Sequence, residues 1–168
     1  TAYEIRLSLV GSEMCIRDST APQQVHLTLH FIGDTHRRDL DGVIESVARS
    51  ASGVQAPRLR VARLIRLPDR DPARLIAAEI EQHGAVAEIR RRLVLRLSRH
   101  ARESRQDRFM PHMTLGRFRS PPGPLAINPA PPAQSEFVLT SVQLMQSVLH
   151  PDGAEHRLVQ EFPLGTGG

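Results

Sequence analysis

Two short stretches of the sequence repeat the order His-x-Thr-Leu inside an apolar setting. The first is "QVHLTLHFIGD" at residues 24–34, and the second is "FMPHMTLGRF" at residues 109–118. Histidine is the side chain most easily poised near neutrality as a proton donor or acceptor. A threonine hydroxyl beside it can donate a hydrogen bond to a charged phosphoryl oxygen. The repeated motif therefore indicates acid–base chemistry on a phosphate ester.

Both motifs have the alternation of a strand, in which side chains two residues apart point to the same face. His26 and Thr28 then share one face, as do His112 and Thr114 in the second copy. The opposite faces should be buried by the apolar residues Leu27, Leu29, Phe31, Met113 and Leu115. The repetition suggests a pseudo-symmetric pair of half-units that face each other across a cleft.

Two histidines on opposite sides of one reacting group can divide the work of cleaving a phosphodiester. One takes a proton from the attacking water, while the other gives a proton to the leaving oxygen. The chemistry needs neither a metal nor a cofactor, and we expect none. The single cysteine, Cys15, is consistent with this because no cysteine or carboxylate cluster with ligand spacing flanks either motif.

Composition places the chain among soluble proteins of one domain, or of two small lobes that share a cleft. Of its 168 residues 40% are apolar, and no apolar run approaches the roughly 20 residues of a membrane span. Without a secretory signal pattern, we expect a cytoplasmic location. All 22 basic residues are arginine and the net charge is +4, which suits a polyanionic substrate. A genomic bias towards arginine is the alternative explanation, and it accounts for most of this excess.

The elements that must position the motifs can be read from periodicity and turn residues. Strands are predicted at 25–33, 57–67 and 74–80 and at the second motif. Helices are predicted at 37–51 and 84–101. Two closing strands are predicted to be joined by a turn at Pro151-Asp152-Gly153. The proline-dense stretch 120–134 is predicted to be irregular. Arg90, Arg91 and Arg92 are expected to form a solvated helix face. The interleaving predicts an α+β or α/β class with mostly antiparallel pairing.

"HLTLHFIGD" and "FMPHMTLGRF" resemble the two signature motifs of the 2H phosphoesterase superfamily. Within it, the sequence is most similar to the RNA 2′,3′-cyclic phosphodiesterases, also called 2′-5′ RNA ligase-like proteins. The likeness covers about residues 20–165 and includes the tail "LMQSVLHPDGAEHRLVQEFPL", with His156 where the family more often has tyrosine. The resemblance implies a bilobal, pseudo-symmetric α+β fold, with two mostly antiparallel sheets lining a central cleft and helices outside.

The same resemblance implies the activity: metal-independent hydrolysis of RNA 2′,3′-cyclic phosphate ends to 2′-phosphates, with reversible 2′-5′ ligation in some members. Carried over by position, His26 would donate a proton to the leaving 3′ oxygen and His112 would activate water. Thr28 and Thr114 would hold the phosphate. The implied partner is an RNA or nucleotide with a 2′,3′-cyclic phosphate, bound by a monomer.

The roles of two further residues near the motifs, Arg117 and His30, depend on how the strands fold. Arg117 matches an arginine common in the family and is a candidate substrate contact. Strict alternation aims it away from His112, so it reaches the phosphate only if the strand contains a β-bulge. His30 falls on the face of His26 where the family has a small residue; it either crowds the cleft or is a solvated histidine at a strand end.

The first 19 residues, "TAYEIRLSLVGSEMCIRDS", resemble translated adapter sequence. We therefore expect 1–19 to be foreign and 20–168 to be a single domain of two lobes. The family has a strand and a long helix before the first motif, which leads us to expect that both are missing here.

Two other functions remain open from the sequence. An RNA-end or nucleotide-binding module of the same fold, impaired in turnover, is one alternative. The other is an unrelated α+β domain in which both motifs are core strands and the two imidazoles lie far apart.

Overall fold

The computed structural model describes residues 16–19, 25–70, 72–97, 109–118, 127–130, 135–150 and 153–165. The chain folds into two compact units, each built from three stretches of sequence. Unit 1 comprises Thr1–Thr28, Leu59–Glu81 and Phe109–Glu136, and unit 2 comprises Leu29–Arg58, Gln82–Arg108 and Phe137–Gly168. The class is mixed α+β with antiparallel sheets and few helices, as the sequence predicts.

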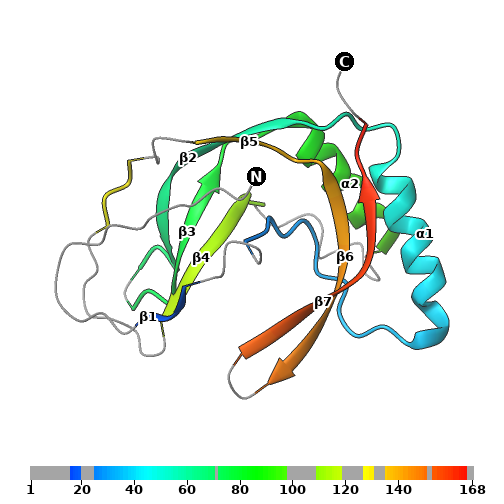
Figure 1. Cartoon of the computed structure of the whole chain (residues 1–168), viewed down its shortest axis with the longest axis horizontal. Helices are drawn as coiled ribbons and strands as arrows, with labels where there is room; N and C mark the ends of the chain where they lie inside the picture. Colours follow the sequence, from blue (N-terminus) through cyan, green and yellow to red (C-terminus); the bar gives the residue numbers. More distant parts are fainter. Residues whose placement is uncertain are drawn as a thin grey trace. The chain divides into compact units, whose positions relative to one another are not determined.

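Unit 1 is organised by a five-stranded sheet (Figure 1). In order across the sheet its strands are β1 (Ile16–Ser19), β4 (His112–Phe118), β3 (Leu75–Ile80), β2 (Arg58–Leu67) and β5 (Glu136–Val138). The pairs β1–β4, β3–β4 and β2–β3 are antiparallel. One face of the three central strands is apolar and buried; it carries Leu59, Val61, Ile76, Ala78, Ile80, Met113 and Leu115. The opposite face is therefore the one that can present polar chemistry.

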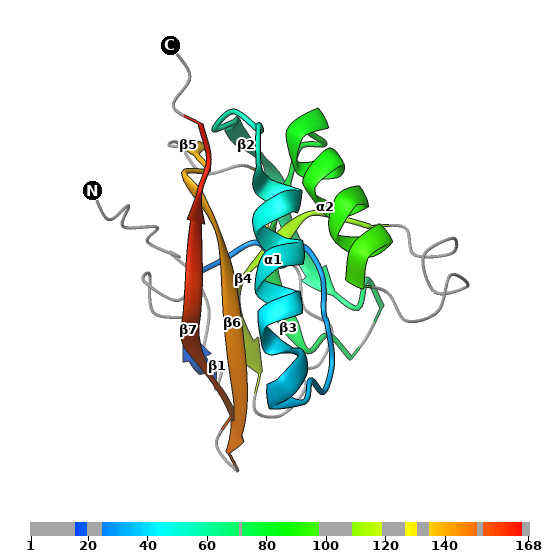
Figure 2. The same ribbon diagram turned by 90° about the vertical axis from the view of Figure 1, so that its right-hand side faces the viewer.

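Unit 2 packs two helices and a hairpin around its own core. Its elements are the short 3-10 helix η2 (Arg37–Asp39), α1 (Leu40–Ala51), α2 (Gly84–Leu97), β6 (Ser141–His150) and β7 (Gly153–Pro163). Helix α1 lies between the β6–β7 hairpin and α2 (Figure 2). The core comprises Val47, Ala51, Val54, Ile89, Leu93, Val142, Leu144, Phe162 and Leu164. Burying these side chains supplies most of the stabilisation of such a unit.

The arginines of α2 differ from the solvated face that the sequence predicts. Arg92 is half-buried, and its guanidinium donates a 2.9 Å hydrogen bond to the Ser52 carbonyl just after the end of α1. A cation is favourable there because the last carbonyls of a helix lack intrahelical partners. Arg91 is exposed and bonds Glu88. Hydrogen bonds from Arg91 and then Arg92 lower the pKa of Glu88 to about 2.

The strand predicted at 25–33 forms only in part. Within the described residues of that range the single ladder pairing is an isolated bridge at Leu27. Phe31, predicted to be buried, is 82% exposed. The alternation fails because the chain passes from unit 1 to unit 2 after Thr28, and Leu29 packs against the core of unit 2.

The other predicted elements are confirmed to within a few residues, where the structure describes them. Helix 84–101 runs to Leu97, and residues 98–101 lie outside the described residues, as do 151–152 of the closing turn and most of 120–134. Of the segment predicted to be foreign, only β1 is described, and its origin stays a prediction. In the described part of the chain, no helix has the length and apolar character needed to cross a membrane.

Candidate active site

The two His-x-Thr motifs lie side by side in unit 1. Leu27 and Met113, the central residues of the motifs, form an antiparallel bridge. In this register His26 stands opposite Thr114, and Thr28 stands opposite His112. The first motif thus lies beside β4, which carries the second motif. This differs from the sequence-based prediction of two half-units that face each other across a cleft.

All four polar side chains of the motifs project to one side. Residues that pair across two strands share a face of the sheet, so Leu27 lies on the same face as Met113. Met113 is only 8% exposed, which shows that this face is buried. The residues on either side of the bridge therefore point to the opposite face. His26 is exposed, and Thr28, His112 and Thr114 are half-buried. His26 and His112 are diagonal neighbours, for which a Cα separation of about 7–8 Å is usual. The register therefore places both histidines on one face of the sheet edge.

A hydrogen bond determines which nitrogen of His112 carries its proton. Nδ1 of His112 lies 2.9 Å from the carbonyl oxygen of Met110. A carbonyl can only accept, so Nδ1 must be the protonated, donating nitrogen. In the neutral ring Nε2 then holds the lone pair. His112 is thereby oriented to accept a proton at Nε2.

A β-bulge brings Arg117 onto the same face as His112. Across β3 and β4, Ile76 pairs with Gly116 while Ala77 pairs with Thr114, so Leu115 is an extra residue in β4. The alternation resets there, and Arg117 pairs with Leu75, two positions from Ala77 along β3. The bulge on which the sequence-based role of Arg117 depended is present. The Arg117 side chain is exposed.

An ion pair that the sequence does not predict continues this polar face. Glu79 of β3 stands opposite His112, and Arg63 of β2 stands opposite Glu79. The Nε of Arg63 lies 2.6 Å from Oε2 of Glu79. The hydrogen bond from Arg63 to Glu79 raises the pKa of Arg63. A single row of polar side chains therefore runs across β4, β3 and β2.

His30 is not a solvated histidine at a strand end. It belongs to unit 2 and is half-buried. Burial lowers its pKa, and the positive charge of Arg90 lowers it further. His30 is therefore a neutral, packed side chain near neutral pH.

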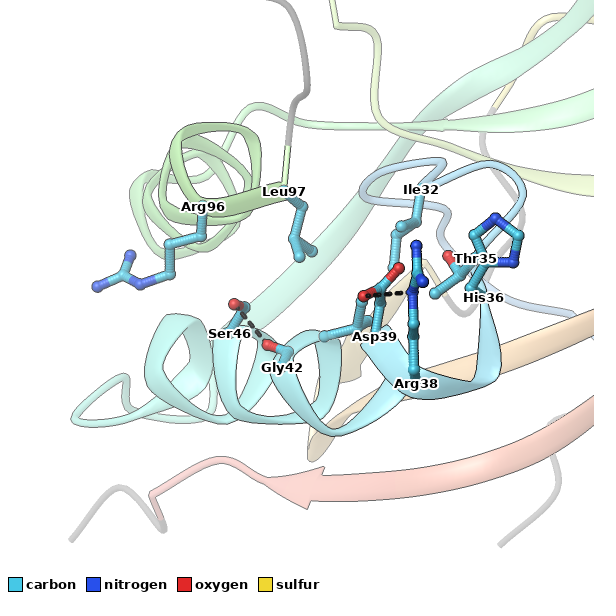
Figure 3. A pocket seen from close by; sticks show the side chains of 10 residues that line it. Ile32, Thr35, His36, Arg38, Asp39, Gly42, Ser46, Arg96 and Leu97 are labelled. Carbon is cyan, nitrogen blue, oxygen red and sulfur yellow. Dashed lines mark hydrogen bonds and ion pairs between the residues drawn. The ribbon is translucent and has the colours of Figure 1, made fainter.

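Unit 2 contains an open cavity of about 490 Å³ beside the start of α1 (Figure 3). It is lined by Ile32, Thr35, His36, Arg38, Asp39, Gly42, Val43, Ser46, Arg96 and Leu97. None of the motif residues lines it. In Figure 3 the guanidinium groups of Arg38 and Arg96 lie apart, so they do not converge on one anion. The chemistry-bearing residues and this cavity are separate features of the chain.

Metal-ligating side chains do not gather in the structure as far as it is described. Among those residues no group of three or more His, Cys, Asp or Glu side chains could hold a metal ion.

Comparison with solved structures supports the fold. The structure of TT0787 from Thermus thermophilus matches with a TM-score of 0.69 at 23% identity, over 88% of this chain and 82% of that chain. Escherichia coli LigT in its apo form matches with a TM-score of 0.69 at 18% identity, over 87% and 79%. A structure described as a phosphoesterase gives 0.70 at 18% identity, over 88% and 81%. At these identities the likeness establishes the fold alone.

Comparison of the sequence with protein-family models establishes the family. The model of the 2′-5′ RNA ligase superfamily matches residues 15–150, which include both His-x-Thr motifs. No curated protein matches the sequence. The match spans most of the chain, and the fold agrees with the 2H phosphoesterase structures. The chain therefore belongs to the 2′-5′ RNA ligase superfamily.

Proposed function

We propose that this protein hydrolyses RNA 2′,3′-cyclic phosphate ends to 2′-phosphates with His26 and His112 as acid and base. The superfamily suggests an enzyme with phosphoesterase or RNA ligase-type activity. The observation that carries the finer proposal is the bridge between Leu27 and Met113, which sets both motifs on one face. Crystal structures of E. coli LigT contain 3′-AMP, NADP+, ATP and phosphate, which supports a nucleotide phosphate as the ligand proposed here.

The proposed reaction is an in-line displacement at phosphorus. Nε2 of His112 takes a proton from water as the water oxygen forms the new bond to phosphorus. The bond from phosphorus to the 3′ oxygen breaks, and protonated His26 gives its proton to that oxygen. The products are a 2′-phosphate and a free 3′-hydroxyl. The protonated Nδ1 of His112, bonded to Met110, supports its role as the acceptor.

The remaining polar groups of this face would bind the phosphate. Thr28 and Thr114 can each donate a hydroxyl hydrogen bond to a non-bridging oxygen, where charge develops in the transition state. Arg117 can add a charge-assisted hydrogen bond from the same face. With a 5′-hydroxyl in place of water as the nucleophile, the same groups would support 2′-5′ ligation: the 5′ oxygen bonds to phosphorus while the bond from phosphorus to the 3′ oxygen breaks.

Turnover of a nucleoside 2′,3′-cyclic phosphate in the presence of EDTA tests the proposal. Wild type should form the 2′-phosphate, and His26→Ala and His112→Ala should each lose about 10²–10⁴-fold in rate. Unchanged turnover in either variant rejects the assignment. RNA-end binding without product formation would instead favour the alternative of a binding module.

A further inference from the structure

Two β-bulges in unit 1 each bring an arginine onto the face of the His-x-Thr motifs. The bulge in β4 does so for Arg117. In β2 the register changes between Val61, which pairs with Ile80, and Arg63, which pairs with Glu79. Ala62 is therefore an extra residue of β2. Without it, Arg63 would share the buried face of Val61.

Arg63 stays accessible although it is held in place. Its side chain is 59% exposed, whereas that of Glu79 is 22% exposed. Glu79 accepts the hydrogen bond from Nε of Arg63. A guanidinium has five N–H donors in a planar fork, so Arg63 can hold Glu79 and a phosphate at the same time. The more covered carboxylate thus serves to orient the more exposed cation.

The position of Arg63 suits a phosphate other than the reacting one. Neighbouring strands lie about 4.8 Å apart, which puts β2 roughly 10 Å from β4. His112, Glu79 and Arg63 form one row across this distance. With a cyclic phosphate bound at His112, Arg63 would lie close to the next phosphate of an RNA strand. A mononucleotide has no second phosphate, so Arg63 would have no group to bind on it.

We infer that Arg63 is a substrate-binding residue that contacts a backbone phosphate upstream of the cyclic end, so that the enzyme prefers an RNA chain to a mononucleotide. Glu79 is the positioning residue for this contact. The inference rests on the proposed function for its choice of substrate. β-Bulges often re-aim a side chain next to an active site, and here two of them act on the same face.

A comparison of two substrates tests the inference. The kcat/KM is measured for a nucleoside 2′,3′-cyclic phosphate and for a tetraribonucleotide with the same cyclic end. In Arg63→Ala the value for the tetranucleotide should fall about tenfold more than that for the mononucleotide, and Arg63→Lys should recover most of the difference. Arg91→Ala is the matched control, because Arg91 is 60% exposed and also pairs with a glutamate. An equal ratio of the two substrates in wild type and Arg63→Ala overturns the inference.

A binding measurement separates this inference from the proposed function. The affinity for a tetraribonucleotide that ends in a 2′-phosphate is followed by fluorescence anisotropy at several salt concentrations. Loss of one phosphate contact should make the slope of log K against log salt shallower by about 0.7 in Arg63→Ala, but not in Arg91→Ala. An unchanged slope, or no binding by wild type, contradicts the role of Arg63. A wild type that binds in this way but hydrolyses neither substrate contradicts the proposed function alone.

Discussion

Leu27 stands opposite Met113, and this one pairing joins two motifs that are far apart in the chain. The two side chains share the buried face of the sheet edge. Their polar neighbours must then share the other face, which makes an acid–base pair of His26 and His112 geometrically reasonable. The proposed function depends on this pairing.

A disulfide between the paired positions tests the bridge directly. Directly opposed residues have Cα atoms about 4.5–5.5 Å apart, within the range that a disulfide accepts. In a Cys15→Ser background, Leu27→Cys with Met113→Cys should therefore oxidise to an intramolecular disulfide, seen as a mass loss and a faster non-reducing mobility. The control pair Leu27→Cys with Leu115→Cys, separated by more than about 7 Å in this register, should stay reduced. The reverse pattern would mean a different register.

Arg117 should contribute to substrate binding because the bulge at Leu115 presents it beside the motifs. Replacing it with alanine removes one charge-assisted hydrogen bond to phosphate, and kcat/KM should fall about 10- to 100-fold. Arg49→Ala is the control, since Arg49 is an exposed arginine of α1 paired with Glu45. Steady-state kinetics with a nucleoside 2′,3′-cyclic phosphate measures both. If the two variants lose the same amount, Arg117 has no special role.

Arg92 and Arg91 are adjacent and both donate hydrogen bonds to Glu88, yet they should contribute differently to the stability of the protein. Arg92 also donates to the Ser52 carbonyl at the end of α1, and its side chain is 28% exposed against 60% for Arg91. Arg92→Ala should lower the free energy of unfolding by about 1–2 kcal/mol, and Arg91→Ala should lower it by clearly less because water screens the exposed Arg91. Urea denaturation of both variants measures the difference. Equal losses would show that the contact with Ser52 adds nothing.

His30 should make stability depend on pH in the mildly acidic range. Its pKa in the folded protein is lowered from 6.5 by burial and by Arg90. Below about pH 6.5 the unfolded chain then binds more protons than the folded one, so stability falls as the pH drops towards the folded pKa. His30→Asn should flatten the profile of melting temperature between about pH 7.5 and 5.5. Arg90→Gln should also make the melting temperature depend less on pH, because it removes a charge that lowers the pKa of His30. An unchanged profile in His30→Asn would show that His30 does not cause the pH dependence.

The fold could be predicted from sequence where periodicity and packing agree. Helix α1 and the strands β2 and β3 carry clear apolar patterns, and the structure has them within a residue or two of the predicted bounds, apart from the 3-10 turn before α1. The strand through Phe31 was wrong because alternation cannot reveal where a chain passes from one packed unit to another.

The sequence predicts which residues form the candidate site, but it does not predict how they are arranged in the sheet. The His-x-Thr repeats stand out as sequence, and their side-by-side pairing became visible only in the sheet register. The faces of Arg63 and Arg117 are set by extra residues in β2 and β4, which become visible only when each strand is aligned with its partner. Paired strands lie far apart in the sequence, so neither motif by itself shows which strand lies beside it.

The most direct test of the account is the pH profile of hydrolysis of a nucleoside 2′,3′-cyclic phosphate in EDTA. With one histidine acting protonated and the other neutral, kcat/KM should follow a bell-shaped curve. Replacing His112 should remove the acidic limb, and replacing His26 should remove the basic limb, each with a rate loss of about 10²–10⁴-fold. A wild type that is inactive in EDTA, or that keeps full activity without either imidazole, would contradict the claim that these two histidines share the reaction.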